Sequence, residues 1–124
     1  YPFKLEDKMP VVKPPTDEEI IKWAYGNDET EPRMEFTVLI STLGKADLLF
    51  GLAMDKKCFN RDFFLNCLYW LSGQMVRMQM VKESAPVFER LFALVEKSDD
   101  LRLKRWMERS KYLFKNPDTY LGQY

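Results

Sequence analysis

The segment FFLNCLYWLSGQMVRMQMV, residues 63–81, decides the fold of this 124-residue chain. Its apolar residues recur every three or four positions, as they do along one face of an α-helix. That face holds Phe64, Cys67, Leu68, Leu71, Met75 and Met78. The opposite edge is a narrow polar stripe formed by Asp62, Asn66, Tyr69, Gly73 and Arg77. A helix that is apolar over most of its circumference is typical of the centre of a bundle, so we predict a central helix over 61–79, capped by Asn60.

Helical patterns also precede this segment. Thr16 followed by Glu19 forms a capping box, which predicts a helix of about ten residues with Gly26 as its C′ residue. Residues 34–42 are ambiguous, because they fit both the alternation of a strand and the spacing of a helix. The chain offers no second convincing strand to pair with them, so we predict a helix. Another short apolar helix follows within 45–57.

Two longer helices are predicted after the central one. Ser84 is placed to cap the first of them, with Pro86 in its first turn. Ser98 or Asp99 is placed to start the second, which ends at residues 116–117, where Asn is followed by Pro.

These elements predict an all-α fold, a compact bundle of five to six short helices. Short connections favour antiparallel neighbours, as in a bundle. The alternative is a short helical-repeat or solenoid segment, but no sequence signature recurs along the chain. We expect an extended Pro-rich arm over 1–15, a single helical domain over 16–116 and an irregular C-terminal tail over 117–124.

Composition restricts the environment and the partners. The chain has 19 basic and 19 acidic residues, so its net charge attracts neither nucleic acid nor an anionic membrane. Lys45 and Asp47 interrupt the longest apolar tract, residues 37–54, which argues against a membrane span. Cys58 and Cys67 have neither disulfide-framework nor metal-site spacing. We expect two free thiols in a reducing, intracellular compartment, with the organelle left open.

The sequence carries no pattern of catalytic residues. It contains no histidine, which removes the usual side chain for proton transfer near neutral pH and the commonest zinc ligand. Its five glycines form no phosphate-binding motif. We therefore predict no enzyme, no cofactor and no metal. A small-ligand carrier or an enzyme with a core pocket, using Asp or Cys residues, remains the third hypothesis.

Two surfaces are candidates for binding a macromolecule. The first is a basic face on the last helix, formed by Arg102, Arg105, Arg109, Tyr112 and Lys115. The second is a groove at the methionine-rich end of the central helix, formed by Met75, Met78, Met80 and Val81. If Trp23 packs in the core, Tyr25 points outward, where a tyrosine can anchor an interface; packing in the core or at its rim is the favoured alternative.

The leading hypothesis is a non-catalytic helical module, adaptor-like, that binds another protein through one of these surfaces. Flexible methionines suit such a groove, because they adapt to the shape of a partner. The alternative is nucleic-acid binding through the basic face, where arginines would contact phosphates and the tyrosine would stack on a base. The oligomeric state is left open.

Overall fold

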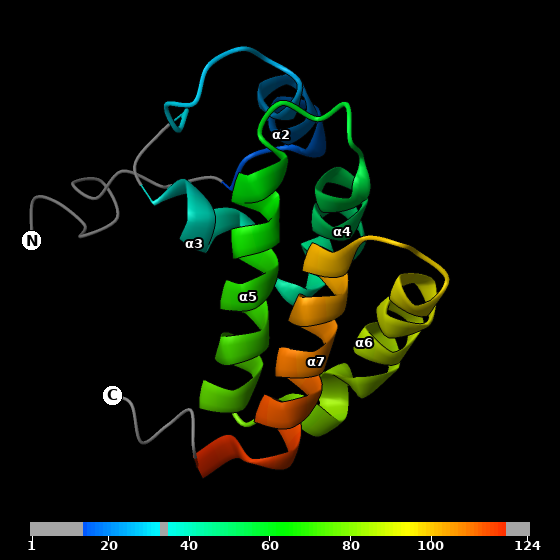
Figure 1. Ribbon diagram of the computed structural model, residues 1–124. Helices are drawn as coiled ribbons and strands as arrows, with labels where there is room; N and C mark the ends of the chain where they lie inside the picture. Colours follow the sequence, from blue (N-terminus) through cyan, green and yellow to red (C-terminus); the bar gives the residue numbers. More distant parts are fainter. Residues whose placement is uncertain (1–13, 33–34, 119–124) are drawn as a thin grey trace, which may run out of the picture.

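The computed structural model describes residues 14–32 and 35–118 and contains, within those ranges, six α-helices and no strand (Figure 1). The helices are α2 (Asp17–Ala24), α3 (Phe36–Ile40), α4 (Ala46–Met54), α5 (Arg61–Arg77), α6 (Val81–Glu96) and α7 (Leu101–Lys115), and a 3-10 helix, η1 (Leu43–Lys45), precedes α4. The all-α prediction is confirmed. None of the helices in the described ranges combines the length and the apolar character that a membrane span requires. Most of the predicted arm and tail, 1–13 and 119–124, lies outside the described residues.

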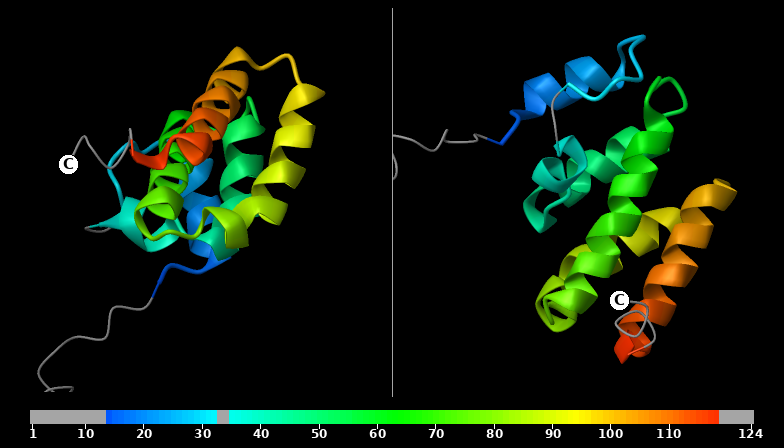
Figure 2. Two further views of the ribbon diagram at one scale, coloured as in Figure 1. Left: turned by 90° about the horizontal axis from the view of Figure 1, so that it is seen from below. Right: turned by 90° about the vertical axis from the view of Figure 1, so that its left-hand side faces the viewer.

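The helices α4, α5, α6 and α7 form a bundle in which successive helices run in opposite directions (Figure 1). Short connections at 55–60, 78–80 and 97–100 join them. α5 packs against α4 and α7, and α6 packs mainly against α7 with smaller contacts to both α4 and α5, so the four helices form a closed ring around one shared core. This closure distinguishes the fold from the open stack of the solenoid alternative. α2 and α3 lie outside the ring, beside α4 and α5 (Figure 2).

α5 is the central helix that the apolar pattern predicts. Its predicted inner face is buried, including Phe64, Cys67, Leu68, Leu71 and Met75. Met78 is the exception: it follows the last turn of α5 and is exposed. Gly73 was predicted on the polar stripe but is buried. α5 packs against α7 as well as α4, which leaves little of its circumference for a polar stripe.

Two buried serines and a tryptophan join α5 to α7. The Trp106 indole N–H donates to Ser72 Oγ at 3.1 Å, and the hydroxyls of Ser72 and Ser110 lie 2.7 Å apart. Ser72 donates its own proton to the Leu68 carbonyl at 3.1 Å, so Ser110 is the donor in the serine pair. All three side chains are at most 1% exposed, so these hydrogen bonds fix how α5 and α7 sit against each other.

Asn60 is the N-cap residue of α5, as predicted, but its side chain makes no capping hydrogen bond to the helix. Its side-chain amide donates instead to the carbonyls of Trp23 at 2.9 Å and Asp28 at 3.0 Å, and its backbone N–H donates to Ala24 at 3.0 Å. The Cys58 thiol also donates to the Ala24 carbonyl, at 3.3 Å. The Ala24 carbonyl at the end of α2 thus gains two donors, and the Asn60 amide adds a donor to the Trp23 carbonyl and to the Asp28 carbonyl in the following loop. Asn60 therefore joins α2 to the start of α5.

α6 begins at Val81, not at Ser84, because the chain reverses directly after α5. Gln79 adopts a left-handed conformation (φ 56°), and Met80 donates its N–H to the Met75 carbonyl at 2.8 Å. This is the hydrogen-bond pattern of a Schellman turn, and it leaves no room for a longer loop. Ser84 lies within α6 and is buried, with its hydroxyl bound to the Val81 carbonyl at 3.2 Å. Pro86 accordingly sits inside the helix and not in its first turn.

α7 is capped one or two residues later than predicted. Asp100 Oδ1 accepts hydrogen bonds from the backbone N–H groups of Arg102 at 3.0 Å and Leu103 at 3.3 Å. Ser98 Oγ in turn accepts from the Asp100 N–H at 3.0 Å. Asp100 also forms an ion pair with Arg61 at the start of α5, so one carboxylate stabilises the beginning of α7 and fixes it beside α5.

The N-terminal predictions hold in part. Thr16 caps α2 by accepting from the Glu19 N–H at 3.2 Å, as the capping box predicts. Gly26 follows the end of α2 without the left-handed conformation that often accompanies that position. Within the described part of the ambiguous segment, residues 35–42, the chain is α-helical over 36–40, and Glu35 adopts a left-handed conformation (φ 60°) immediately before this helix.

Replacing Ser72 by Ala should lower the free energy of unfolding by about 2–3 kcal/mol, because the Trp106 N–H and the Ser110 hydroxyl both lose their buried partner. Ser110→Ala is the matched control. It should cost only about 1 kcal/mol, because every remaining group keeps a hydrogen bond. Urea unfolding measures both variants, and equal losses would contradict this assignment of the hydrogen bonds.

Asn60→Asp distinguishes the two roles of that residue. A carboxylate is a good helix cap but has no N–H to donate to Trp23 and Asp28. We expect the variant to lose about 2 kcal/mol or more of unfolding free energy, since two carbonyls lose their donor and face a negative charge. Asn66→Asp, on the exposed side of the same helix, should change stability by less than about 0.5 kcal/mol. Wild-type stability for Asn60→Asp would restore the capping role.

Candidate functional site

Three of the four residues in the predicted groove line one cavity. Met75, Met78 and Met80 border a space of about 240 Å³ between the end of α5 and the segment containing α3 and η1. The remaining lining residues are Val38, Ser41, Thr42, Leu43, Trp70 and Gln74. We call this cavity the methionine groove. Val81, the fourth predicted residue, lines other cavities, because the chain has already entered α6 at that point.

The rim of the methionine groove is apolar and open to solvent. Val38 is 49% exposed, Trp70 36% and Met78 59%. These side chains come from α3, the middle of α5 and the turn after α5. Sequence reasoning identified the methionines but not Val38 or Trp70, because the approach of these two side chains depends on how α3 packs against α5.

Both cysteines are free and buried, as predicted. Burial raises the pKa of the Cys67 thiol to about 12, although the neighbouring Ser41 hydroxyl lowers it slightly. Burial also raises the pKa of Cys58 above its ordinary value. Both thiols are therefore protonated near neutral pH, which makes them poor nucleophiles.

The predicted basic face is divided in the structure. Arg102, at one end, forms an ion pair with Asp62 on α5. Lys115, at the other end, lines a cavity between α6 and α7 together with Lys111. Three residues in the middle of the face are exposed, namely Arg105, Arg109 and Tyr112. Their neighbours Glu108 and Lys111 are exposed as well. Nucleic-acid binding by this face stays a prediction.

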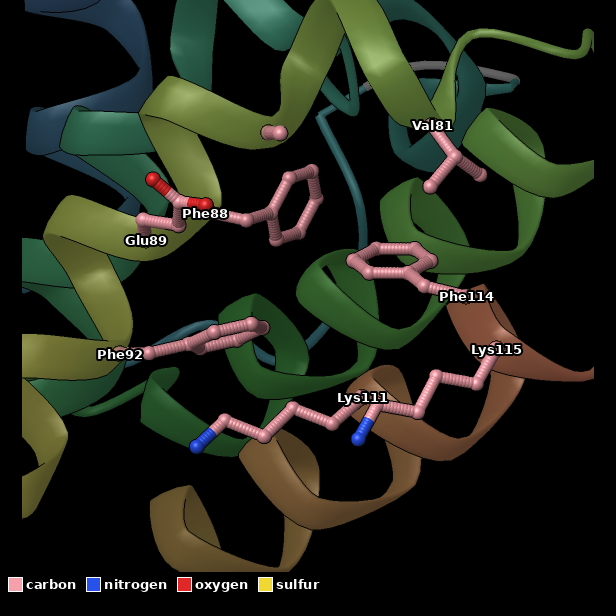
Figure 3. Close-up of a pocket in the computed structure, with 8 residues that line it drawn as sticks. Val81, Phe88, Glu89, Phe92, Lys111, Phe114 and Lys115 are labelled. Carbon is pink, nitrogen blue, oxygen red and sulfur yellow. The ribbon is translucent and has the colours of Figure 1, made fainter.

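The cavity between α6 and α7 was missed by sequence reasoning. It has a volume of about 390 Å³, and Figure 3 shows the residues that line it. They are Val81, Ala85, Phe88, Glu89, Phe92, Lys111, Phe114 and Lys115. We call it the α6–α7 pocket. The only pattern that points to it is the one-turn spacing of Phe88 and Phe92 on one helix and of Lys111 and Lys115 on the other.

Tyr25 is exposed, but it already has a partner within the chain. Its hydroxyl donates to the carboxylate of Asp55, in the connection between α4 and α5. This hydrogen bond is the main reason that the pKa of Tyr25 rises to about 12, and it also lowers the pKa of Asp55. Tyr25 thus attaches the end of α2 to the bundle and is not a free interface anchor.

Trp23 is half-buried, in an aromatic cluster at the edge of the core. Its ring meets Phe63 and Phe36 edge-on, with centroids 4.8 and 5.3 Å away, and its indole N–H donates to the Thr30 carbonyl at 2.9 Å. This cluster attaches α2 and α3 to the central helix. It thereby holds α3 in the position that completes the methionine groove.

Within residues 14–32 and 35–118, no group of three or more acidic or cysteine side chains is arranged to hold a metal ion. Comparison of the chain with protein-family models, with curated proteins and with solved structures found no significant match. The proposals below therefore rest on the geometry and chemistry of this chain.

The link between Tyr25 and Asp55 should be visible in a titration. The folded-state pKa of Tyr25 lies above its ordinary value of 10.0, so the link stabilises the fold below pH 10 and loses this effect as the pH rises towards 12. The Asp55 pKa is lowered, so that carboxylate contributes above its ordinary value of 3.8 and the contribution is lost at lower pH.

We expect tyrosinate absorbance, taken as the difference between wild type and Tyr25→Phe, to report one group that ionises near pH 12. Asp55→Asn should move this ionisation down towards 10.0, the ordinary value. Circular dichroism at each pH shows whether the chain is still folded. An unchanged titration in Asp55→Asn would mean that another group raises the pKa of Tyr25.

Proposed function

We propose that this chain is a protein-interaction module whose methionine groove receives an apolar side chain of a partner protein. The observation that carries the proposal is the gathering of three exposed apolar side chains, Val38, Trp70 and Met78, around one cavity. Single exposed apolar residues are normal on a protein surface, but several that gather around one cavity are typical of a binding site.

The size of the groove favours a protein partner over a small ligand. Its volume of about 240 Å³ is below the roughly 300–1,000 Å³ of pockets that enclose a small molecule. A space of this size suits one apolar side chain inserted from a larger surface. Trp70 is well suited to such a contact, because tryptophan is enriched among the residues that dominate binding energy.

The chemistry of the lining also restricts the partner. The described residues that line the groove include no charged side chain. The accessible polar groups are the Thr42 hydroxyl and the Gln74 amide, which suit hydrogen bonds to a partner's backbone, whereas the Ser41 hydroxyl is buried. The methionines add flexible apolar contact, which lets the groove adapt to different aliphatic or aromatic side chains. The expected partner therefore presents a neutral, apolar residue on an accessible segment.

Met78→Glu tests this function, because it places a charge on the apolar rim. We use the full chain to isolate binding proteins and then measure the affinity of each purified partner. Met78→Glu should weaken binding by about 2 kcal/mol or more, which is about 30-fold. Leu94→Glu is the matched control, since Leu94 is also exposed but lies on α6, and it should leave affinity unchanged.

Two results would refute the proposal. The first is a set of partners that bind wild type, Met78→Glu and Leu94→Glu equally. The second is a wild-type dimer in sedimentation experiments that Met78→Glu dissociates, because the groove would then be covered by a second copy of this chain.

A further inference from the structure

The α6–α7 pocket has rigid aromatic walls. The rings of Phe88 and Phe114 meet edge-on with centroids 5.0 Å apart, and Phe92 lies 5.8 Å from Phe88 (Figure 3). Phe92 also packs on Trp106, at 5.3 Å, and Trp106 is fixed by its hydrogen bond to Ser72. The walls are therefore formed before any ligand binds, and the volume of about 390 Å³ lies within the roughly 300–1,000 Å³ of small-molecule sites.

The charged groups of the pocket are separated by side. Lys111 and Lys115 lie one turn apart on α7 and extend along that side of the pocket, whereas Glu89 comes from α6 (Figure 3). The lining thus carries two positive charges and one negative charge, a net charge of +1. A ligand with one anionic group is attracted to the α7 side and repelled from the α6 side, which gives it a defined orientation.

The two lysines differ in whether the ammonium group already has a partner within the chain. The Lys111 ammonium lies 5.6 Å from the centre of the Phe92 ring and 3.6 Å from a Glu96 oxygen, so it is positioned at the pocket edge. Lys115 forms no ion pair with any acidic side chain in the described ranges. Its ammonium is therefore the cation most available to an incoming anion.

We propose that the α6–α7 pocket binds a small apolar monocarboxylate. The hydrocarbon part packs on Phe92 and Phe114, with Val81 and Ala85 also in the lining, and the carboxylate pairs with Lys115 beside Lys111. The aromatic walls favour a ligand with an apolar body, and the net charge of +1 in the lining favours a ligand with a single anionic group. This site is separate from the methionine groove, so the inference does not depend on the proposed function.

Octanoate, octanol and octylamine are suitable probes, because they share a chain and differ in the charge of the head group. Isotope-labelled full chain is titrated with each, and amide resonances are followed by NMR. Octanoate should give saturable shifts at residues of the pocket, and it should bind about five-fold more tightly than octanol, which is what an exposed ion pair supplies. Octylamine should bind more weakly than octanol.

Four variants locate the site. Lys115→Met removes the charge but keeps the chain length, so it should lower octanoate affinity to that of octanol and leave octanol affinity unchanged. Ala85→Leu should abolish binding of both probes, because it fills the pocket from half-buried α6 surface without altering the buried core. Lys104→Met, elsewhere on α7, and Met78→Glu, in the methionine groove, should bind octanoate like wild type.

Several results would overturn the proposal. They are the absence of saturable shifts, shifts that persist in Ala85→Leu, equal affinity for octanol and octanoate, preference for octylamine, or no effect of Lys115→Met. Helicity of each variant is measured in parallel. If Ala85→Leu fails to fold, the selective loss of octanoate binding in Lys115→Met still decides the question.

Discussion

The rest of the structure depends on the buried hydrogen bonds between Ser72 and the α7 residues Trp106 and Ser110. Apolar packing alone is tolerant of small shifts along a helix, whereas a buried indole N–H needs an acceptor at a defined place. Ser72 supplies it, and α5 and α7 are thereby fixed in one register. The ion pairs Arg61–Asp100 and Arg102–Asp62 then fall at the same end of the two helices.

The α6–α7 pocket follows from this register, whereas the methionine groove depends on how α3 packs against α5. Trp106 presents its ring to α6, where Phe88 and Phe92 pack on it and form the inner wall of the α6–α7 pocket. On the other side of α5, Trp23 and Phe63 pack with Phe36 at the edge of the same core and hold α3 against the central helix. The surface features that we associate with binding therefore lie beside packed aromatic side chains.

The sequence predicted those features that depend on neighbours along the chain. The apolar spacing of 63–81 gave the central helix, and Thr16 capped the helix that follows it. Predictions failed where a distant carbonyl or helix competes for a residue. Asn60 is a residue type that often caps helices, but its side-chain amide donates to the carbonyls of Trp23 and Asp28. The methionines of the groove are close in sequence and could be found, whereas Val38 and the pairing of Phe88 with Lys115 depend on tertiary packing.

The turn at Gln79 explains how two consecutive residues, Met80 and Val81, line two cavities that differ in chemistry. A left-handed conformation costs a non-glycine residue roughly 1–2 kcal/mol, and here the paired hydrogen bonds of the Schellman turn and the start of α6 hold it in place. The reversal directs Met80 into the methionine groove and Val81, the next residue, into the α6–α7 pocket. A longer loop would separate these residues from both sites, so the tightness of this turn allows one helix junction to border two cavities, one neutral and one cationic.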